Sequence, residues 1–276
     1  MGARAVGSGA SLAARPLSTT APSTGGARRF ENKVAVVTGA GRDIGRATAE
    51  RFAAEGAAVV LHYHSSADGA NQAADEINAS GGRAVTVQAD LATEDGAAAV
   101  AAAAAGLGPE IHALVHNSGG LVERRALADM DLAFLRHVMD LNFTSLFLLA
   151  RACAPAMPEG AALVTLSSQA ARDGGGPGAG AYAASKGAVH TYTRSLAKEL
   201  GAQGVRVNTV TPGMIATGFH DTFTADEVRK NVAAATQLKR EGRADECASV
   251  IAFLCSEDAS YMTGTALDIN GGLAFS

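Results

Sequence analysis

The sequence is poor in the residues from which disulfide and metal frameworks are built. It has three cysteines in 276 residues, at Cys153, Cys247 and Cys255, and no two of them form a C-x-x-C pair. An odd number of scattered cysteines argues against a disulfide scaffold and is typical of a reducing compartment. His62 and His64 form an H-x-H pair, but no cysteine or third histidine lies nearby in the sequence to complete a zinc set, so we expect no metal site.

Long apolar runs and an excess of basic charge are also missing. No stretch of about 18 uninterrupted apolar residues occurs, so we expect no membrane span. Positions 30–276 hold 19 basic and 27 acidic residues, which argues against nucleic acid and anionic membranes as partners. Hydrophobic residues make up 47% and charged residues 18% of the chain, a composition that forms a core and excludes wholesale disorder.

The first 29 residues differ from the rest in composition. They are rich in Ala, Ser, Thr, Gly and Arg without acids, as in an organelle transit peptide, and Arg15 is placed to precede a processing cut before Ser18. A disordered extension explains the same composition, so both interpretations stay open. We expect residues 30–276 to form the folded domain, located in the cytoplasm or, if residues 1–29 are a transit peptide, in the mitochondrial or another organelle matrix.

From residue 33 onward, apolar segments alternate with stretches of helical periodicity. Several of these segments are nearly continuous rather than alternating, as a parallel sheet covered on both faces requires. The expected strands are Lys33–Thr38, Ala57–Tyr63, Arg83–Ala89, Ile111–Asn117, Ala161–Ser168, Val205–Thr211 and Ala266–Asn270. This pattern predicts a single-domain α/β fold of the Rossmann type, a doubly wound parallel sheet of about seven strands with helices on both faces.

A glycine-rich turn, TGAGRDIG at positions 38–45, follows the first strand and opens a helix. Glycines let backbone N–H groups approach a pyrophosphate, and the helix N-terminus adds a partial positive charge. Asp43 is unfavourable beside a pyrophosphate unless its side chain points away, so we expect it to cap the helix.

The end of the second strand bears on which dinucleotide fits. A site for NAD usually carries an acidic residue there, about 20 residues after the turn, that binds the ribose 2′-hydroxyl. This chain has Tyr63, His64 and Ser65 at that place, with no acid. Arg42, His64 and Ser65 offer donors for a 2′-phosphate, so NADP(H) is favoured as the cofactor and NAD(H) stays open.

Tyr182 and Lys186 form a Y-x-x-x-K on an expected helix, where residues four apart share a face. A nearby ammonium lowers the pKa of a phenol from about 10, which suits a general acid/base. Ser168 ends a strand upstream, where its hydroxyl can hydrogen-bond a developing oxyanion. Asn142 lies in an apolar helix, where its amide is costly unless it is hydrogen-bonded.

Together these motifs resemble the short-chain dehydrogenase/reductase family over about residues 32–272. The chain departs from the family pattern at Asp43, which replaces the usual second glycine of the turn. The spacing from Ser168 to Tyr182 is also one residue longer than is common. The extra residue lies in a glycine-rich loop, and Ser167 is the alternative if the register shifts.

The resemblance implies a role for each matching residue. The catalytic set is Tyr182 as acid/base, with Lys186, Ser168 and Asn142. The expected cofactor-binding residues are Gly39, Arg42, Ile44, Gly45, His64, Ser65, Asp90, Leu91, Asn117, Gly119, Tyr182, Lys186 and Thr217. Within this set, the resemblance places Asp90 at the adenine and Thr217 at the nicotinamide carboxamide.

The expected activity is hydride transfer between NADP(H) and a small-molecule carbonyl or secondary alcohol. A 3-oxoacyl-acyl-carrier-protein reductase is the alternative. An acidic carrier protein requires a basic patch, yet Gly160 and Gln203 stand where those reductases carry basic residues. The arginines that offer substitutes are Arg124, Arg125 and Arg151. A nucleotide-binding protein without the chemistry is a further alternative, favoured only by the acid in the glycine turn.

Two larger segments complete the resemblance. Residues 214–235, with Phe219, His220 and Phe223, resemble the mobile substrate lid of the family, although their composition does not identify a substrate. The family is mostly tetrameric, so we expect a homotetramer, with Met130–Met157 and Ala181–Gly201 as the apolar segments for the subunit contact.

Overall fold

The computed structural model describes residues 28–275, and residues 1–27, which hold most of the proposed extension, lie outside it. Its centre is one parallel sheet with the strand order β3-β2-β1-β4-β5-β6-β7. The strands are β1 (Val34–Val37), β2 (Ala58–Tyr63), β3 (Arg83–Gln88), β4 (Ala113–His116), β5 (Ala162–Leu166), β6 (Arg206–Pro212) and β7 (Ala266–Ile269). Each lies within two residues of a predicted strand, so the predicted fold is confirmed.

The central strands are buried along their whole length, which explains their continuous apolar sequences. Every residue of β1, β4 and β5 is buried. In the register of the sheet, Val36 of β1 pairs with Val60 of β2 on one side and with Leu114 of β4 on the other. Side chains of alternate residues point to opposite faces, so each strand contributes to two separate cores.

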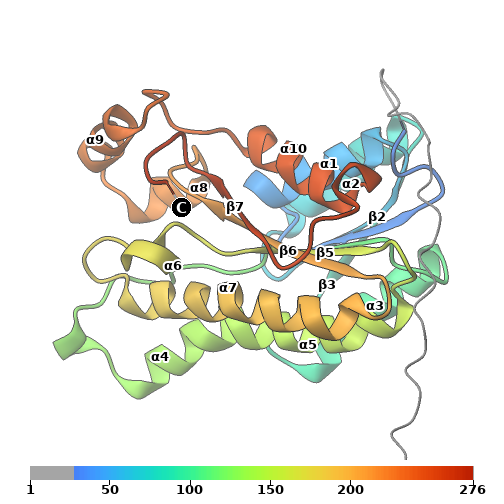
Figure 1. Cartoon of the computed structure of the whole chain (residues 1–276), viewed down its shortest axis with the longest axis horizontal. Coiled ribbons are helices and arrows are strands. Elements are labelled where there is room, and N and C mark those ends of the chain that lie inside the picture. Colours follow the sequence, from blue (N-terminus) through green and yellow to red (C-terminus); the bar gives the residue numbers. More distant parts are fainter. Residues whose placement is uncertain (1–27, 276) are drawn as a thin grey trace, which may run out of the picture.

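Helices cover both faces of the sheet (Figure 1). One face carries α1 (Asp43–Ala54), α2 (Ala67–Ala79) and α10 (Ala244–Cys255), and the other carries α3 (Glu94–Leu107), α5 (Ser145–Cys153) and α7 (Gly180–Gly201). Phe52 of α1 and Ile251 of α10 are fully buried in the first core. Val100 of α3 and Leu149 of α5 are fully buried in the second. This three-layer arrangement leaves the ends of the strands free for a site.

The long apolar segment expected to contact another subunit is interrupted. It contains α4 (Leu132–Met139), a π-helical turn at Asp140–Thr144, and α5. By length and composition the stretch Leu132–Ala156 suffices to cross a membrane, with a mean hydropathy of 1.3, but a core helix meets the same criterion. Leu149 and Cys153 indeed lie in the core beside the sheet. The stretch is therefore weak evidence for a span.

The order of the strands determines where a ligand fits. The chain runs outward from β1 through β2 to β3, then returns to the other side of β1 and continues from β4 to β7. Crevices in open parallel sheets form at the carboxyl ends of the strands where this direction reverses. The short helices α6 (Ala170–Asp173), α8 (Gly218–Phe223) and α9 (Asp226–Ala235) follow β5 and β6 at that end.

Candidate active site

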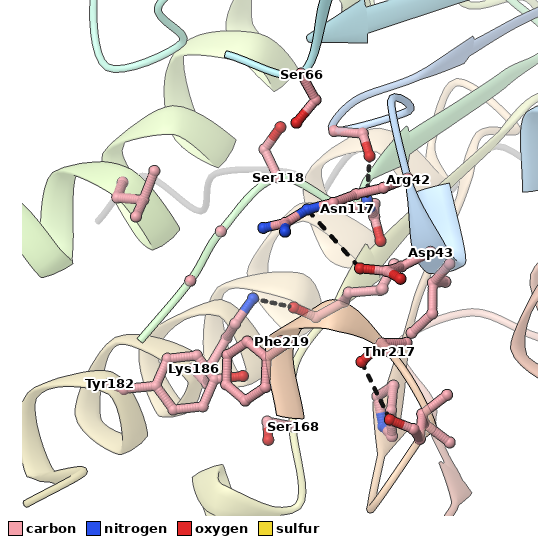
Figure 2. A pocket seen from close by; sticks show the side chains of 18 of the residues that line it. Arg42, Asp43, Ser66, Asn117, Ser118, Ser168, Tyr182, Lys186, Thr217 and Phe219 are labelled. Atoms are coloured by element: carbon pink, nitrogen blue, oxygen red, sulfur yellow. Dashed lines mark hydrogen bonds and ion pairs between the residues drawn. The ribbon is translucent and has the colours of Figure 1, made fainter. Parts of the chain in front are cut away.

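A cavity of about 500 Å³ lies at the carboxyl ends of the central strands, within the usual range for small-molecule sites. Figure 2 shows its walls, with the glycine turn on one side and Tyr182, Ser168 and Phe219 on the other. The predicted site residues that line it are Gly39, Arg42, Ile44, His64, Ser65, Asn117, Gly119, Ser168, Tyr182, Lys186 and Thr217. Most of the set predicted from the sequence therefore meets in one place.

Hydrogen bonds centred on Thr38 and Asn117 hold the glycine turn in shape. The hydroxyl of Thr38, a fully buried residue, accepts from the backbone N–H of Asn117 (3.0 Å) and of Ser118 (2.9 Å). The Asn117 amide donates to the carbonyls of Thr38 (2.9 Å) and Gly39 (3.1 Å). A Cβ on Gly45 would lie 2.1 Å from the Gly39 carbonyl oxygen, so only glycine lets the helix start this close to the turn.

The structure corrects the expectation that Asp43 caps its own helix. Asp43 has a φ of 53°, a left-handed conformation that costs most residues about 1 kcal/mol but that Asp tolerates better than most. Arg42 is the N-cap residue of α1 and makes no side-chain cap bond. The Asp43 carboxylate instead accepts the backbone N–H of Gly218 at 3.2 Å and lies 3.8 Å from Nε of Arg42. The side chain thus turns away from α1 because a donor from another segment reaches it.

The end of β2 presents polar groups to the same cavity. Tyr63, His64 and Ser65 line it, and the last two are exposed. His62, in contrast, is buried beneath the turn, where Nδ1 accepts from the Gly39 N–H (3.3 Å) and Nε2 donates to the Ala89 carbonyl (3.1 Å). Burial lowers the pKa of His62. Both of its ring nitrogens are engaged, which leaves none to bind a metal.

Ser168, Tyr182 and Lys186 come together where β5 meets α7. Tyr182 and Lys186 share one face of α7, and Lys186 Nζ lies 5.9 Å from the centroid of the Tyr182 ring. The Lys186 ammonium donates to the Leu166 carbonyl at 2.8 Å. Ser167 and Ser168 both line the cavity, but the Ser167 hydroxyl is buried and already donates to the Lys186 carbonyl at 2.9 Å. The geometry thus favours Ser168 over Ser167 as the hydroxyl that faces a ligand.

Electrostatics at this group differ from the sequence expectation. Burial raises the pKa of the Tyr182 phenol, and the neighbouring Ser168 hydroxyl opposes the rise. The expected lowering of the Tyr182 pKa was therefore wrong for this structure, because burial outweighs it. The Lys186 ammonium donates instead to the Leu166 carbonyl. Burial also lowers the pKa of Lys186 from 10.5 to about 8. Burial therefore favours the uncharged form of both side chains, the phenol of Tyr182 and the amine of Lys186.

Asn142 lies under the cavity, in the π-helical turn between α4 and α5. It is fully buried, and its amide donates to the carbonyls of Val138 (2.9 Å) and Gly120 (2.9 Å) and accepts from the Gly120 N–H (3.0 Å). A Cβ on Gly119 would lie 2.4 Å from Oδ1 of Asn142 and 3.0 Å from Nζ of Lys186. Glycine at 119 is what allows these two side chains to approach the strand end.

The segment after β6 covers one side of the cavity. Thr217, Phe219 and His220 line it, and the rings of Phe219 and Tyr182 are 5.8 Å apart between centroids. The Thr217 hydroxyl donates to the Ile215 carbonyl at 3.1 Å. At the far end of α8, Arg124 donates to the carbonyls of Phe223 and Pro177, both at 3.0 Å. We call Thr217–Phe223 the lid segment.

Four predicted residues do not reach the cavity wall. They are Gly45, Asp90, Leu91 and Asn142. The Asp90 carboxylate accepts the Ala92 N–H at 2.9 Å, and Leu91 is buried. Sequence reasoning missed several residues that do line it, namely Ser66, Ser118, Gly120, His137 and Leu141. His137 and Leu141 are brought there by the turn between α4 and α5, for which no motif gave a signal.

Within residues 28–275, no group of three or more His, Cys, Asp or Glu side chains is arranged to hold a metal ion. The cysteines Cys153, Cys247 and Cys255 are buried and unpaired. Burial raises the pKa of each of these thiols to about 12, so they remain protonated and unreactive.

Comparisons with known proteins show the family of the chain. A family model described as enoyl-(acyl carrier protein) reductase matches residues 39–274. An uncharacterized oxidoreductase of Methylorubrum extorquens is 37% identical over 89% of this chain and 99% of its own length. A 3-oxoacyl-[acyl-carrier-protein] reductase of Synechocystis is 36% identical over 87% of this chain and 96% of its own length. A short chain dehydrogenase from Burkholderia cenocepacia, solved in complex with NADP, superposes with a TM-score of 0.83 at 32% identity, covering 89% of this chain and 99% of that chain.

Proposed function

Because the chain belongs to the short-chain dehydrogenase/reductase family, whose members are NAD(P)-dependent oxidoreductases of CH–OH groups, we propose that it interconverts a carbonyl and a secondary alcohol with NADP(H). The observation that carries this proposal is the meeting of Ser168, Tyr182 and Lys186 on one wall of a cavity whose opposite wall is the glycine turn. A carbonyl placed between these walls lies beside both a proton donor and the dinucleotide.

The shape of the turn fits a dinucleotide. Cβ atoms on Gly39 and Gly41 would lie 2.9 Å from the Asn117 amide and 2.5 Å from the Ser66 carbonyl oxygen, so only glycine lets the turn pack this closely, and both glycines line the cavity. In the proposed binding mode, Gly39, Ile44 and Gly45 form the pyrophosphate cradle, and Asn117 and Gly119 continue it along the β4 end. The remaining contacts are assigned by resemblance to Asp90 and Leu91 at the adenine, to Thr217 at the carboxamide, and to Tyr182 and Lys186 at the nicotinamide ribose.

NADP(H) is proposed over NAD(H) on the chemistry of the β2 end. His64 and Ser65 are exposed there, with Arg42 65% exposed on the adjoining turn, and all three line the cavity. A carboxylate at this place would repel a 2′-phosphate, whereas these groups can donate to one. The NADP complex of the Burkholderia relative supports the same choice.

In the proposed mechanism the bound nicotinamide supplies or accepts the hydride. Tyr182 holds the proton that passes to the carbonyl oxygen, and Ser168 donates a hydrogen bond to the charge that develops there. Burial raises the pKa of Tyr182, so the phenol carries its proton at neutral pH. Lys186 stands behind the phenol and, with a water held at the Asn142 turn, returns the proton.

The test is Tyr182→Phe. We expect turnover of a carbonyl panel to fall by about 10²–10⁴-fold, the usual contribution of general acid catalysis. Calorimetry should give an NADPH affinity close to that of the unaltered protein. Tyr192→Phe is the matched control, since Tyr192 is on the same helix but packs against Phe143, with ring centroids 5.5 Å apart. Full turnover by Tyr182→Phe would refute the mechanism, and tighter binding of NADH than of NADPH would refute the cofactor preference.

Reduction of 3-oxoacyl groups on a carrier protein is the second candidate, supported by the Synechocystis relative. The arginines that might form a basic docking patch already have partners within the chain. Arg124 bonds to the lid segment, Arg125 pairs with Glu123 at 2.9 Å, and Arg151 pairs with Glu94 at 2.9 Å. Faster reduction of acetoacetyl-acyl-carrier protein than of acetoacetyl coenzyme A would support this candidate.

A homotetramer is proposed from the family and from apolar surface near the expected contact. Leu132 of α4 and Phe147 of α5 are 58% and 39% exposed, and both lie in the segment expected at the contact. Sedimentation should show an assembly of four chains, and a stable monomer would refute the proposal.

A further inference from the structure

Asp43 is the one carboxylate among the residues of 28–275 that line the cavity, and it stands where the family pattern has glycine. It keeps a left-handed backbone, with a φ of 53°, and its side chain is only 29% exposed. A side chain retained in such a conformation points to a function. We propose that Asp43 is a positioning residue that fastens the lid segment to the glycine turn.

The fastening contact joins segments that are far apart along the chain. Oδ1 of Asp43 accepts the backbone N–H of Gly218 at 3.2 Å, across a separation of 175 residues. Gly218 is the first residue of α8, and the Thr217 side chain makes no cap bond to this helix. Its hydroxyl donates to the Ile215 carbonyl. Figure 2 shows Asp43 on the turn directed toward the stretch that carries Thr217. The carboxylate therefore supplies the acceptor that the start of this helix requires.

One residue, Phe219, links Gly218 to Tyr182, the proposed acid/base. Phe219 is next in α8, and its ring lies 5.8 Å from that of Tyr182, between centroids. At the other end of α8, Arg124 donates to the Phe223 carbonyl at 3.0 Å. The lid segment is thus held at both ends, by the turn at its start and by Arg124 at its end. By holding Gly218, Asp43 keeps the Phe219 ring against the Tyr182 ring.

The proposed role of Asp43 depends on its hydrogen-bond acceptor and not on its charge. Nε of Arg42 lies 3.8 Å from Oδ2, which offsets part of the negative charge near the site of a pyrophosphate. The other oxygen, Oδ1, is the one that meets Gly218. An asparagine would keep this acceptor, would tolerate a positive φ and would carry no charge. A glycine would keep the backbone conformation and lose the acceptor.

These two substitutions give a matched pair for hydrogen exchange without cofactor. In Asp43→Gly, we expect amide exchange of the peptide covering residues 215–223 to be at least fivefold faster than in the unaltered protein. In Asp43→Asn, exchange should stay within twofold. Exchange of α3 peptides should be unchanged in both, which controls for unfolding. Equal exchange in all three proteins, or equally fast exchange in both variants, would overturn the proposal.

A second measurement rests on the proposed function. It follows the release of NADPH through the fluorescence of NADPH itself. Release should be at least fivefold faster from Asp43→Gly than from the unaltered protein, with the KM for a carbonyl raised more than kcat is changed. Asp43→Asn should restore slow release. If the unaltered protein binds no NADPH, the proposed function fails while hydrogen exchange still decides on the fastening. If NADPH binds but leaves both variants at equal rates, the role of Asp43 as a hydrogen-bond acceptor is refuted.

Discussion

The glycine turn and the lid segment face each other across one cavity, yet the hydrogen bonds that hold them differ in burial. Those of the turn converge on Thr38, which is fully buried, and on Asn117 beside it. Those of the lid segment lie nearer the surface, such as the contact of the exposed Arg124 with the Phe223 carbonyl and the pairing of Arg229, 18% exposed, with the exposed Asp221. Every residue of α8 and α9 stays at least partly exposed.

This difference teaches where the site is rigid and where it can open. A hydrogen bond shielded from water is costly to break, because its groups find no replacement partners. An exposed pair exchanges readily with water and contributes little to stability. The glycine-turn side of the cavity is therefore formed in advance, whereas the lid segment can move without disturbing the core.

Thr38→Val is expected to have the largest effect on this contrast. The change keeps the shape of the side chain but leaves the backbone N–H groups of Asn117 and Ser118 without their acceptor. Each unsatisfied donor costs up to about 1–3 kcal/mol, so for these two part-buried N–H groups we expect the free energy of unfolding to fall by roughly 2–6 kcal/mol and NADPH affinity to fall at least tenfold. Urea unfolding and calorimetry measure the two quantities.

Thr48→Val serves as its control, since the Thr48 hydroxyl is also buried but only donates to the Ile44 carbonyl within α1. It should lose little stability and keep its affinity for NADPH. Equal losses in the two variants would show that the turn is not held in the way its contacts suggest.

Lys186→Met is expected to have an intermediate effect, which appears in the pH dependence of the free energy of unfolding. Burial lowers the pKa of Lys186 to about 8 in the folded protein from 10.5. Between these values the unfolded chain binds more protons, so the contribution of Lys186 to stability improves as pH rises, by about 1.4 kcal/mol per unit at most. The unfolding free energy of the unaltered protein should therefore rise relative to that of the variant between pH 8 and 10.

The readout for Lys186 is the difference in urea unfolding free energy between the two proteins at pH 7, 8, 9 and 10. Lys198→Met, which removes an exposed lysine of the same helix, controls for general effects of charge. A difference that does not change with pH would contradict the deep burial of the Lys186 ammonium.

Arg124→Ala should have the smallest effect on stability. Its contacts with the Phe223 and Pro177 carbonyls are exposed, so we expect a loss below about 1 kcal/mol. The KM for the best-reduced carbonyl of the panel should nevertheless rise about three- to tenfold, because the lid segment loses its second attachment. Arg125→Ala is the control, since Arg125 lies over the Phe134 ring, 4.1 Å from its centroid, and not on the lid segment. Matching KM values for the two variants would contradict this role.

The same contrast between buried and exposed parts decides how much could be predicted from sequence. Strands such as Val34–Val37 are buried on both faces, so their apolar runs predicted them to within two residues. Tyr182 and Lys186 were recognised because helical spacing alone places them on one face. The glycine turn was recognised because its shape depends on local glycines.

The remainder depends on contacts between distant segments. Asp43 was expected to cap α1, because no local pattern indicates that Gly218 supplies a donor. The pKa of Tyr182 was expected to fall, since spacing shows that Lys186 is near but not that its ammonium is directed at Leu166. The π-helical turn at Asp140–Thr144 brings Leu141 to the cavity. Its sequence is like that of a regular apolar helix, so no pattern predicted it.

The sequence separation of 175 residues from Asp43 to Gly218 also has a consequence for biosynthesis. Chains are synthesised at about 5–20 residues per second, so the turn waits roughly ten to thirty-five seconds before its cover is translated. Thr38 finds its partner Asn117 much earlier, which protects the buried part of the turn during this interval. A nascent chain halted before Gly218 should hold a dinucleotide only briefly, so slow release of the dinucleotide would mark a polypeptide whose lid segment has been translated.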